Sequence, residues 1–306
     1  MLSKNNDSLR KKDNINYIAL GSFDGLHKGH LTLIEKLVDL VKDSKGKSIV
    51  YTFKNHPRTL INSKSVPKLL LDNFSKEEIL KEKKVDLVYF EEFTEEFMKK
   101  TPEDFVKYLI EKFKIKGIVV GFNFRFGYKN MGDVKLLNEL SLKYNFEVWV
   151  MKPCKFDEEV ISSTRIREEI SNGNLEKVSE MLTREYFLKG TVVYGRQIGR
   201  TIGFPTANLE YSKSILLPKD GVYYTNVLLK NIKYKGITSI GNNPTVNGNT
   251  ITVETFILNF NGNIYGDEIK VRFIKRIRDN IKFNSINELK DQLNKDKIFA
   301  EKQKNM

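Results

Sequence analysis

The stretch Gly21-Ser22-Phe23-Asp24-Gly25-Leu26-His27-Lys28-Gly29-His30 follows the apolar run Tyr17-Ile18-Ala19-Leu20. Apolar residues then recur at helical spacing between Leu33 and Val41, so this order predicts a strand, a glycine-rich turn and the start of a helix. Both histidines then fall in the first helical turn, where unpaired backbone N–H groups and the helix dipole favour an anion. The stretch therefore predicts a phosphate site.

The two histidines of this stretch suit nucleotidyl transfer. That reaction builds negative charge on the attacked α-phosphate and on the departing pyrophosphate, and donors fixed in advance stabilise it without a covalent intermediate. Gly29, just before His30, lets the backbone come close to a triphosphate. A lone H-x-x-H is more often an ordinary polar surface turn, but the complete strand, turn and helix context favours a phosphate site here.

Composition limits the class of protein. The chain has 306 residues and 40% hydrophobic content, which is enough for a sizeable core, and we expect two domains, residues 1–182 and 183–306. Its one cysteine excludes an intramolecular disulfide and suits a reducing compartment. The apolar runs are all shorter than the roughly 20 residues of a membrane span, so we expect a cytoplasmic protein without a membrane partner.

The net charge of +13 could indicate a nucleic-acid binder. The surplus lies mostly in the second half and is diffuse, without a block of like charges or a basic motif interleaved with aromatics. We therefore expect a lysine-rich solvated surface and no nucleic-acid partner. Such a surface would in any case attract polyphosphate substrates.

The first half alternates predicted strands and helices, the pattern of a parallel sheet. Strands are expected over the ranges 47–53, 85–90, 117–121 and 147–151, and helices over 75–84 and from Pro102, with Thr101 as cap. His56 follows the second of the five strands, at a carboxyl end where open α/β sheets place ligands. A zinc site at the three histidines is less favoured, because cysteine or carboxylate ligands at suitable spacing are missing beside them.

Two later segments of this half allow both a structural and a functional interpretation. Asn123-Phe124-Arg125 could stack on a flat ring and hold a phosphate, or could simply extend a hydrophobic strand. Ser162, Ser163 and Thr164 precede a segment with apolar residues at helical spacing, which predicts a helix cap. With Arg167 they also form a candidate anion-binding site, because a guanidinium can donate two parallel hydrogen bonds to phosphate oxygens.

The second half is rich in short β segments, over 187–194, 222–229, 232–240, 251–260 and 268–274, which predict an antiparallel barrel. Asn261-Gly262-Asn263 is a hairpin signal, and a final helix is expected from about Ser285. In the glycine-rich segment 195–208, Gly199 and Gly203 permit backbone N–H groups to wrap an anion, and Thr206 with Asn208 could ligate Mg²⁺. The alternative for this segment is a flexible barrel loop.

Several motifs resemble known families. The pattern G-x-F-D-G-x-H-x-G-H resembles the flavin adenylyltransferase branch of the nucleotidyltransferase superfamily, and I-S-S-T-x-x-R at 161–167 and the segment 121–127 are similar to further motifs of that branch. G-F-P-T-A-N at 203–208 resembles the riboflavin kinase signature. From about residue 16 to 299 the chain resembles bifunctional bacterial riboflavin kinase/FAD synthetases.

The resemblance implies a Rossmann-like nucleotidyltransferase α/β/α domain followed by an antiparallel β-barrel kinase domain with a terminal helix. It implies that His27 and His30 act in adenylyl transfer and that Glu254 is the kinase base, although strand alternation alone predicts an outward-facing carboxylate there. Implied nucleotide contacts are Gly21, Phe23, Gly29, Ser162, Ser163, Thr164, Arg167, Gly199, Gly203, Thr206 and Asn208. Implied flavin contacts are His56, Asn123, Phe124, Arg125 and Arg278, and implied Mg²⁺ ligands are Thr206 and Asn208.

The implied activity has two steps, phosphorylation of riboflavin to FMN with Mg-ATP and adenylylation of FMN to FAD with a second ATP. The sequence departs from the family pattern at Lys129-Asn130 and at Asn280. One alternative is therefore a chain that retains only one activity, and another is a basic RNA-binding module on a nucleotidyltransferase-like scaffold. RNA affinity would fall steeply with salt, whereas flavin turnover would depend mainly on Mg²⁺ and ATP. The sequence leaves a homo-oligomer open.

Overall fold

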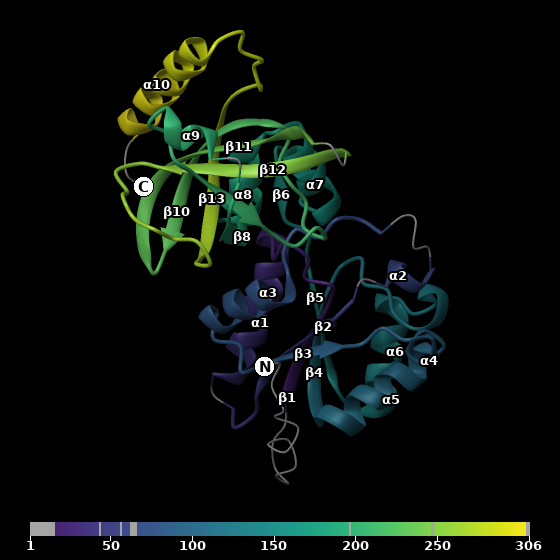
Figure 1. Ribbon diagram of the computed structural model, residues 1–306. Coiled ribbons are helices and arrows are strands. Elements are labelled where there is room, and N and C mark those ends of the chain that lie inside the picture. The colour runs from purple at the N-terminus through teal and green to yellow at the C-terminus, as the bar shows by residue number, and fades with distance from the viewer. Residues whose placement is uncertain are drawn as a thin grey trace. The chain divides into compact units, whose positions relative to one another are not determined.

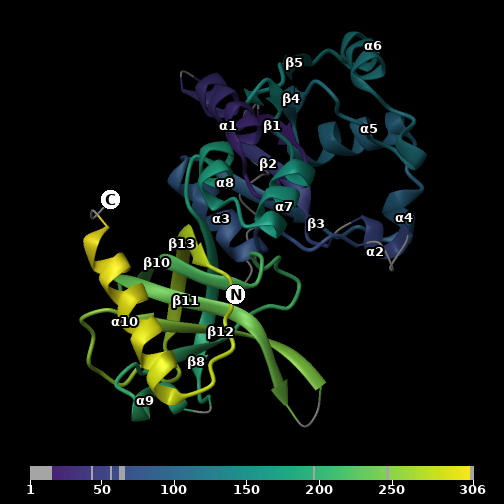
Figure 2. The same cartoon turned by 90° about the horizontal axis from the view of Figure 1, so that it is seen from above.

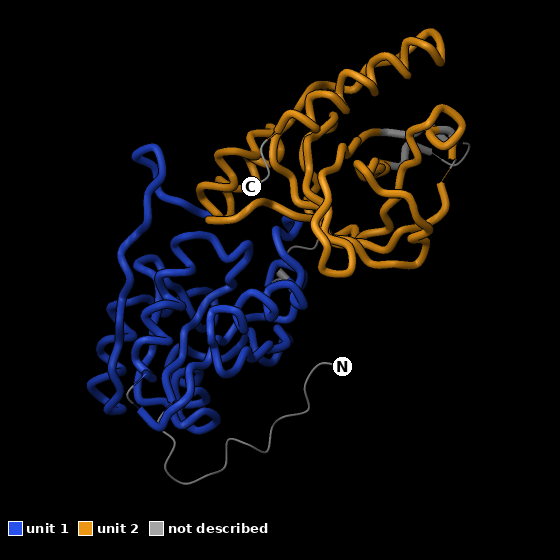
Figure 3. The backbone as a smooth tube through the Cα atoms, turned by 90° about the vertical axis from the view of Figure 1, so that its left-hand side faces the viewer, with its two compact units in different colours: residues 1–162 blue, residues 163–306 orange. Residues whose placement is uncertain are grey.

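The computed structural model describes residues 16–42, 44–55, 57–61, 66–195, 197–245 and 248–303. The chain forms two compact units, residues 1–162 and 163–306 (Figure 3). The helices α7 (Ser163–Asn172) and α8 (Leu175–Leu182) belong to the second unit, where they pack on each other and α8 contacts strands of the barrel. The compact units thus divide before the predicted domain boundary at residue 182, and that functional boundary stays a prediction.

The first unit contains a five-stranded parallel sheet in the order β3-β2-β1-β4-β5. Its strands are β1 (Asn16–Leu20), β2 (Ser48–Phe53), β3 (Leu87–Glu91), β4 (Ile115–Gly121) and β5 (Glu147–Met151). The predicted Rossmann-like arrangement is confirmed. Because the strand order reverses direction at β1, the crevice for ligands in such a sheet lies at the carboxyl ends of β1 and β4.

Helices cover both faces of this sheet. Figure 1 shows α1 (Lys28–Val41) and α3 (Asn73–Glu82) on one face, and α5 (Pro102–Phe113) and α6 (Val134–Tyr144) on the other. Strand alternation separates the two cores, since Ile18 and Leu20 pack with residues of α5 and α6. The shorter elements are α2 (Arg58–Ile61), α4 (Glu95–Met98), the 3₁₀ turn η3 (Tyr128–Asn130) and the hairpin of β6 (Lys155–Phe156) with β7 (Glu159–Val160).

The second unit contains a closed antiparallel barrel in the order β10-β11-β12-β9-β8-β13. Its strands are β8 (Tyr186–Val193), β9 (Thr206–Glu210), β10 (Gly221–Leu229), β11 (Ile232–Thr245), β12 (Gly248–Ile257) and β13 (Glu268–Arg278), and the short helix α9 (Ile198–Thr201) precedes β9. The predicted barrel is confirmed. Strand β9 was not predicted, because its first three residues belong to the glycine-rich segment 195–208.

The predicted hairpin at Asn261-Gly262-Asn263 is wrong. In the barrel order β9 and β8 lie between β12 and β13, so these two strands do not pair. The tight hairpin instead joins β10 to β11 through Lys230 and Asn231, whose φ angles of 48° and 65° suit a two-residue turn. Turn residues identify a reversal of the chain, but the partner of each strand depends on the closure of the barrel.

The terminal helix α10 (Ile286–Lys302) begins as predicted, with Ser285 as its N-cap. It lies along the outside of the barrel (Figure 2), where Ala300 packs against Val222 and Ile237. At its other end the Lys235 ammonium donates to the carbonyls of Glu301 and Gln303. Of the helices in the described ranges, none has the length and apolar character that a membrane crossing requires.

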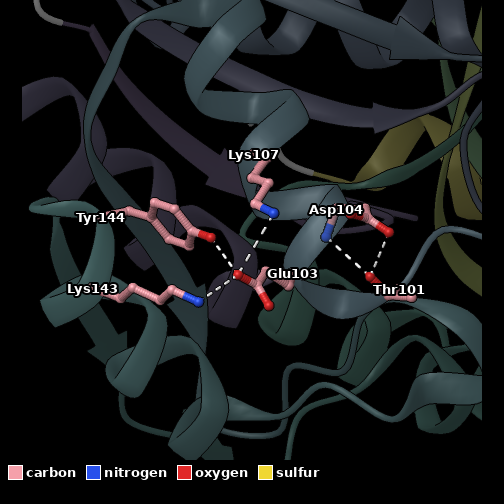
Figure 4. Close-up of polar contacts among 6 residues, drawn as sticks. All are labelled: Thr101, Glu103, Asp104, Lys107, Lys143 and Tyr144. Atoms are coloured by element: carbon pink, nitrogen blue, oxygen red, sulfur yellow. Dashed lines mark hydrogen bonds and ion pairs between the residues drawn. The ribbon is translucent and has the colours of Figure 1, made fainter.

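A surface network links α5 to α6 in the first unit. Figure 4 shows Glu103 of α5 between Lys107, Lys143 and Tyr144, and its carboxylate lies 2.8 Å from the Lys143 ammonium and 3.7 Å from that of Lys107. The tyrosine hydroxyl also donates to this carboxylate. The hydrogen bonds from Lys143 and Tyr144 lower the pKa of Glu103 from 4.5 to about 2.

We expect this network to stabilise the fold slightly. A depressed carboxyl pKa contributes stability that is complete above the unfolded value and is lost as the pH falls through the folded one. Glu103→Gln should therefore lower the melting temperature on the order of 1–3 °C near neutral pH, and by less as the pH falls below about 4 or as salt is added. Calorimetry of Glu103→Gln and of the control Asp39→Asn checks this prediction. The control removes one exposed ion pair, that of Asp39 with Lys42. Equal, salt-independent effects of the two changes would contradict it.

Candidate active sites

The turn after β1 is folded around one aromatic ring. Phe23 is fully buried, and a Cβ atom added to Gly21 would lie 3.2 Å from its ring. Phe23 and Leu26 have φ angles of 47° and 42°, which are uncommon for residues other than glycine. A side chain at position 21 would press on the Phe23 ring, and the turn leads the chain into α1.

The two histidines begin α1, as predicted. His27 is the N-cap, and its Nδ1 accepts a hydrogen bond from the His30 backbone N–H at 3.3 Å. The imidazole rings stack with centroids 3.6 Å apart, and the Phe23 ring meets His30 edge-on at 5.3 Å. A Cβ at Gly29 would lie 3.3 Å from the His27 ring. The structure therefore brings Gly21, Phe23, His27, Gly29 and His30 together at the helix N-terminus.

Two residues that no sequence motif marks, Thr52 and Lys76, support this turn. The Ser22 carbonyl accepts hydrogen bonds from Thr52 Oγ1 of β2 at 2.9 Å and from Lys76 Nζ of α3 at 3.0 Å. Asp24 is also buried, and its Oδ1 accepts from the Leu70 backbone N–H. No local signal marks Lys76, because a lysine in an early helical turn ordinarily points into solvent.

The loop after β4 alternates between core and solvent. Phe124 stacks on the buried Phe126 with centroids 5.4 Å apart, while Asn123 and Arg125 are exposed. Arg125 lies 3.5 Å from Asp133, the N-cap of α6. The aromatic residues thus pack into the core of the unit, and the exposed polar residues lie near the carboxyl end of β4. Flavin contacts from this loop remain predictions, and His56 lies outside the described residues.

The serine-rich motif crosses the division between the units. Ser162 ends the first unit, while Ser163, Thr164 and Arg167 lie in the first turns of α7 in the second. The predicted helix start is confirmed. Ser162, Ser163 and Arg167 are half-buried and Thr164 is exposed. Their nucleotide contacts remain predictions.

In the barrel, the pairing of β9 with β12 gathers the predicted kinase residues. Glu254 pairs with Asn208 in this ladder, and the Thr206 hydroxyl donates to Glu254 Oε2 at 3.2 Å. The Asn208 side chain lies against Gly195, where a Cβ would come within 2.2 Å of it. Three side chains separated by up to 48 positions in the chain therefore lie beside one another.

Glu254 faces outward from the barrel, as strand alternation predicts, since Val253, Thr255 and Ile257 face inward and Glu254 shares a face with Phe256. That outer face is covered. Phe204 of the glycine-rich loop is buried and meets the Phe256 ring edge-on at 5.2 Å. The loop therefore folds over β12, and Glu254 is only half-exposed beneath it.

The two glycines of this loop are required for different reasons. A Cβ at Gly199 would lie 2.2 Å from the Phe204 carbonyl oxygen, so a side chain there would collide with the backbone. Gly203 has a φ of 86° and open space around it. A side chain at 203 would meet no neighbouring atom but would be strained by the backbone conformation.

Arg278 is used within the barrel unit. Its guanidinium binds the Asp296 carboxylate of α10 through Nε at 3.1 Å and Nη2 at 2.7 Å, and Asp296 is 2% exposed. Next to it, Asn280 Nδ2 donates to the Ile240 carbonyl at 2.8 Å. These contacts give both residues structural roles, so the predicted flavin contact of Arg278 remains a prediction.

The fold and the two clusters define a class: a nucleotidyltransferase-type α/β unit joined to a β-barrel kinase unit. The FAD synthetase family model matches residues 9–165, and the riboflavin kinase family model matches residues 182–304. The chain belongs to the bifunctional riboflavin kinase/FMN adenylyltransferase family.

Relatives of that name cover nearly the whole chain. The protein of Buchnera aphidicola subsp. Schizaphis graminum is 34% identical over 304 residues, which span 98% of this chain and 97% of that protein. The protein of Haemophilus influenzae is 34% identical over 281 residues, 91% of each chain. A crystal structure described as a macrolide-efflux protein from Streptococcus pneumoniae superposes with a TM-score of 0.87 at 31% identity, covering 99% of this chain and 98% of that one. The fold is shared over the full length.

The Arg278–Asp296 pair yields a stability prediction. Asp296→Asn leaves a guanidinium that is largely buried without its counter-charge, and breaking such a pair costs about 3 kcal/mol or more. Urea unfolding should show this loss, whereas Glu301→Gln, at an exposed pair on the same helix, should change stability by less than about 1 kcal/mol. Similar unfolding midpoints for the two variants would contradict a structural role for Asp296.

Proposed function

We propose that this chain makes FAD from riboflavin in two steps. The barrel transfers the γ-phosphate of ATP to riboflavin, giving FMN and ADP. The α/β domain then transfers AMP from a second ATP to the FMN phosphate and releases pyrophosphate. The observation that carries the proposal is that each unit has its own constellation, His27 with His30 in one and Thr206, Asn208 and Glu254 in the other.

For the kinase step, we assign Glu254 as the base. Its carboxylate lies beside the Thr206 hydroxyl on a face covered by the glycine-rich loop. In that position it can accept the proton of the riboflavin 5′-hydroxyl as the oxygen attacks the γ-phosphate. The loop with Gly199 and Gly203 would hold the phosphates through its backbone N–H groups.

The donor set at β9 and β12 fits Mg²⁺. Thr206, Asn208 and Glu254 offer hydroxyl, amide and carboxylate oxygens, the ligands this ion prefers, and Mg²⁺ is ordinarily held by few protein ligands together with substrate phosphates. Among the described residues, no group of three or more His, Cys, Asp and Glu side chains is arranged to hold a metal alone. The proposed ion would therefore arrive with ATP, on Thr206 and Asn208, and neutralise phosphate charge.

For the adenylyl step, we assign His27 and His30 as donors to the phosphates. They lie at the N-terminus of α1, where the helix dipole adds to the attraction for an anion. Ser162, Ser163, Thr164 and Arg167 are proposed as further nucleotide contacts, and Asn123, Phe124 and Arg125 as flavin contacts. We place the boundary of the two functional domains near residue 182, where the kinase family match begins.

The departures from the family pattern have structural accounts. Asn130 has a φ of 58°, a conformation that asparagine tolerates well, and Asn280 donates a hydrogen bond to the Ile240 carbonyl within β11. This supports retention of both activities over the single-activity alternative. We also propose that the partners are small molecules and not nucleic acid, and that the enzyme acts in the cytoplasm. The decisive test is incubation with riboflavin, ATP and Mg²⁺ followed by chromatography, which should show FMN and then FAD.

Gly203→Val should abolish formation of FMN. A β-branched residue resists a φ of 86°, so the loop could not keep its shape around a phosphate. Conversion of supplied FMN to FAD should continue and serves as the control on folding. Normal riboflavin phosphorylation by a folded Gly203→Val protein would mean that this loop does not hold ATP.

Glu254→Gln and His30→Ala should separate the two steps. Glu254→Gln removes the base with little change of shape, so FMN formation should stop while supplied FMN is still adenylylated. His30→Ala deletes a donor at the transferring phosphate, and loss of one such donor costs on the order of 10²-fold in rate. That variant should accumulate FMN from riboflavin and make little FAD.

Mixing the two variants should restore conversion of riboflavin to FAD, because FMN made by one can diffuse to the other. If His30→Ala abolished riboflavin phosphorylation in a folded protein, the assignment of one reaction to each domain would be wrong. Loss of adenylylation of supplied FMN in Glu254→Gln would contradict it equally.

A further inference from the structure

Lys76 is a buried lysine. It is 5% exposed, and lysine is rarely buried because removing an ammonium from water costs free energy unless partners surround it. Here its Nζ donates to the Ser22 carbonyl at 3.0 Å. The charged groups that act on it are Asp24, in the turn after β1, and Asp72, the N-cap of α3. The ammonium therefore lies directly under the turn that precedes the two histidines.

The Ser22 carbonyl is fixed from two elements at once. Thr52 of β2, which is fully buried, donates to the same oxygen at 2.9 Å, so α3 and the sheet hold the turn together. The turn needs such support. Phe23 and Leu26 have positive φ angles, and conformations of this kind persist only when the surrounding structure holds them.

The shape of this turn determines where the imidazoles lie. The Phe23 ring contacts His30 edge-on, and His30 stacks on His27. A shift of the Ser22–Phe23 backbone would move this stack relative to a bound phosphate. A displacement of about 1 Å at a catalytic group can lower a rate on the order of 10²-fold.

We propose that Lys76 is a positioning residue for adenylyl transfer, because its ammonium holds the Ser22 carbonyl and thereby the turn that presents His27 and His30. The inference rests on the proposed adenylyltransferase function of this unit. The ammonium also interacts favourably with the carboxylates of Asp24 and Asp72.

Lys76 gives the proposal a pH signature. Burial lowers the pKa of Lys76 from 10.5 to about 8, and the smaller effects of Asp24 and Asp72 oppose that decrease. The ammonium is therefore present below about pH 8 and lost above it. Adenylylation should fall as the pH rises through that value, while riboflavin phosphorylation in the barrel should not follow the same curve.

The test compares Lys76→Met with Lys76→Arg and with the control Lys81→Met. Lys81 lies on the same helix but is exposed, paired with Glu77. For each protein, FMN-to-FAD and riboflavin-to-FMN rates are measured from about pH 6.5 to about pH 9.5. Lys76→Met should lower kcat for FAD formation about 10-fold or more, with a smaller change in the KM for ATP. Lys76→Arg, whose charge does not titrate in this range, should keep part of the rate and lose the decline at high pH.

Lys81→Met should behave as wild type in both reactions. A wild-type rate and pH profile in Lys76→Met would overturn the proposal, as would an equal loss of both reactions in a folded protein. If Lys76→Met does not fold, Thr52→Val decides the matter, because it removes the other donor to the Ser22 carbonyl. Unchanged FAD formation in Thr52→Val would then overturn the proposal.

Failure of the proposed function would look different. A wild-type protein that phosphorylates riboflavin but converts no FMN to FAD at any pH would contradict the adenylyltransferase assignment itself, and this inference with it. The variant results described above would not contradict the adenylyltransferase assignment, because the wild-type protein would still convert FMN to FAD.

Discussion

The pairing of β9 with β12 is the constraint on which the barrel unit depends. Strand β9 is short, yet it closes the barrel between β12 and β8 and thereby fixes both ends of the glycine-rich loop. The same ladder sets Asn208 opposite Glu254 and brings the Thr206 hydroxyl to the Glu254 carboxylate. One set of backbone hydrogen bonds thus both completes the fold and assembles the proposed kinase site. A signature motif that would otherwise be a mobile loop is held by the sheet it completes.

In the α/β unit, the corresponding constraint is the turn after β1. This strand lies where the order of the sheet reverses, so its carboxyl end is at the position where such sheets bind ligands. The turn is packed around the buried Phe23 and held from below by Thr52 and Lys76. Both units therefore follow the same plan, in which residues for chemistry lie on short segments whose backbone is fixed by neighbouring strands and helices.

The two units also show how structural residues can resemble site residues. Arg278 lies in a stretch similar to the kinase family, and its strongest contacts are with Asp296 of the terminal helix. Phe124 alternates with polar residues in a loop, and its ring packs on Phe126 in the core. The buried ion pair and the aromatic packing give Arg278 and Phe124 structural roles in their units.

The sequence by itself determined the order of elements, the parallel sheet, the barrel and the helix that begins at the two histidines. Hydrophobic period, capping residues and glycine-rich turns determine these features, because they are local properties. Through the resemblance to a family it also identified Thr206 and Asn208 as Mg²⁺ and nucleotide contacts and Glu254 as the kinase base. Only the tertiary structure decided that β9 is a strand, that β12 and β13 do not form a hairpin, and that Glu254 lies on a covered outer face. It alone placed Lys76 under the turn at Ser22, because a lysine's burial depends on residues more than fifty positions away, and no periodicity within a helix records such a contact.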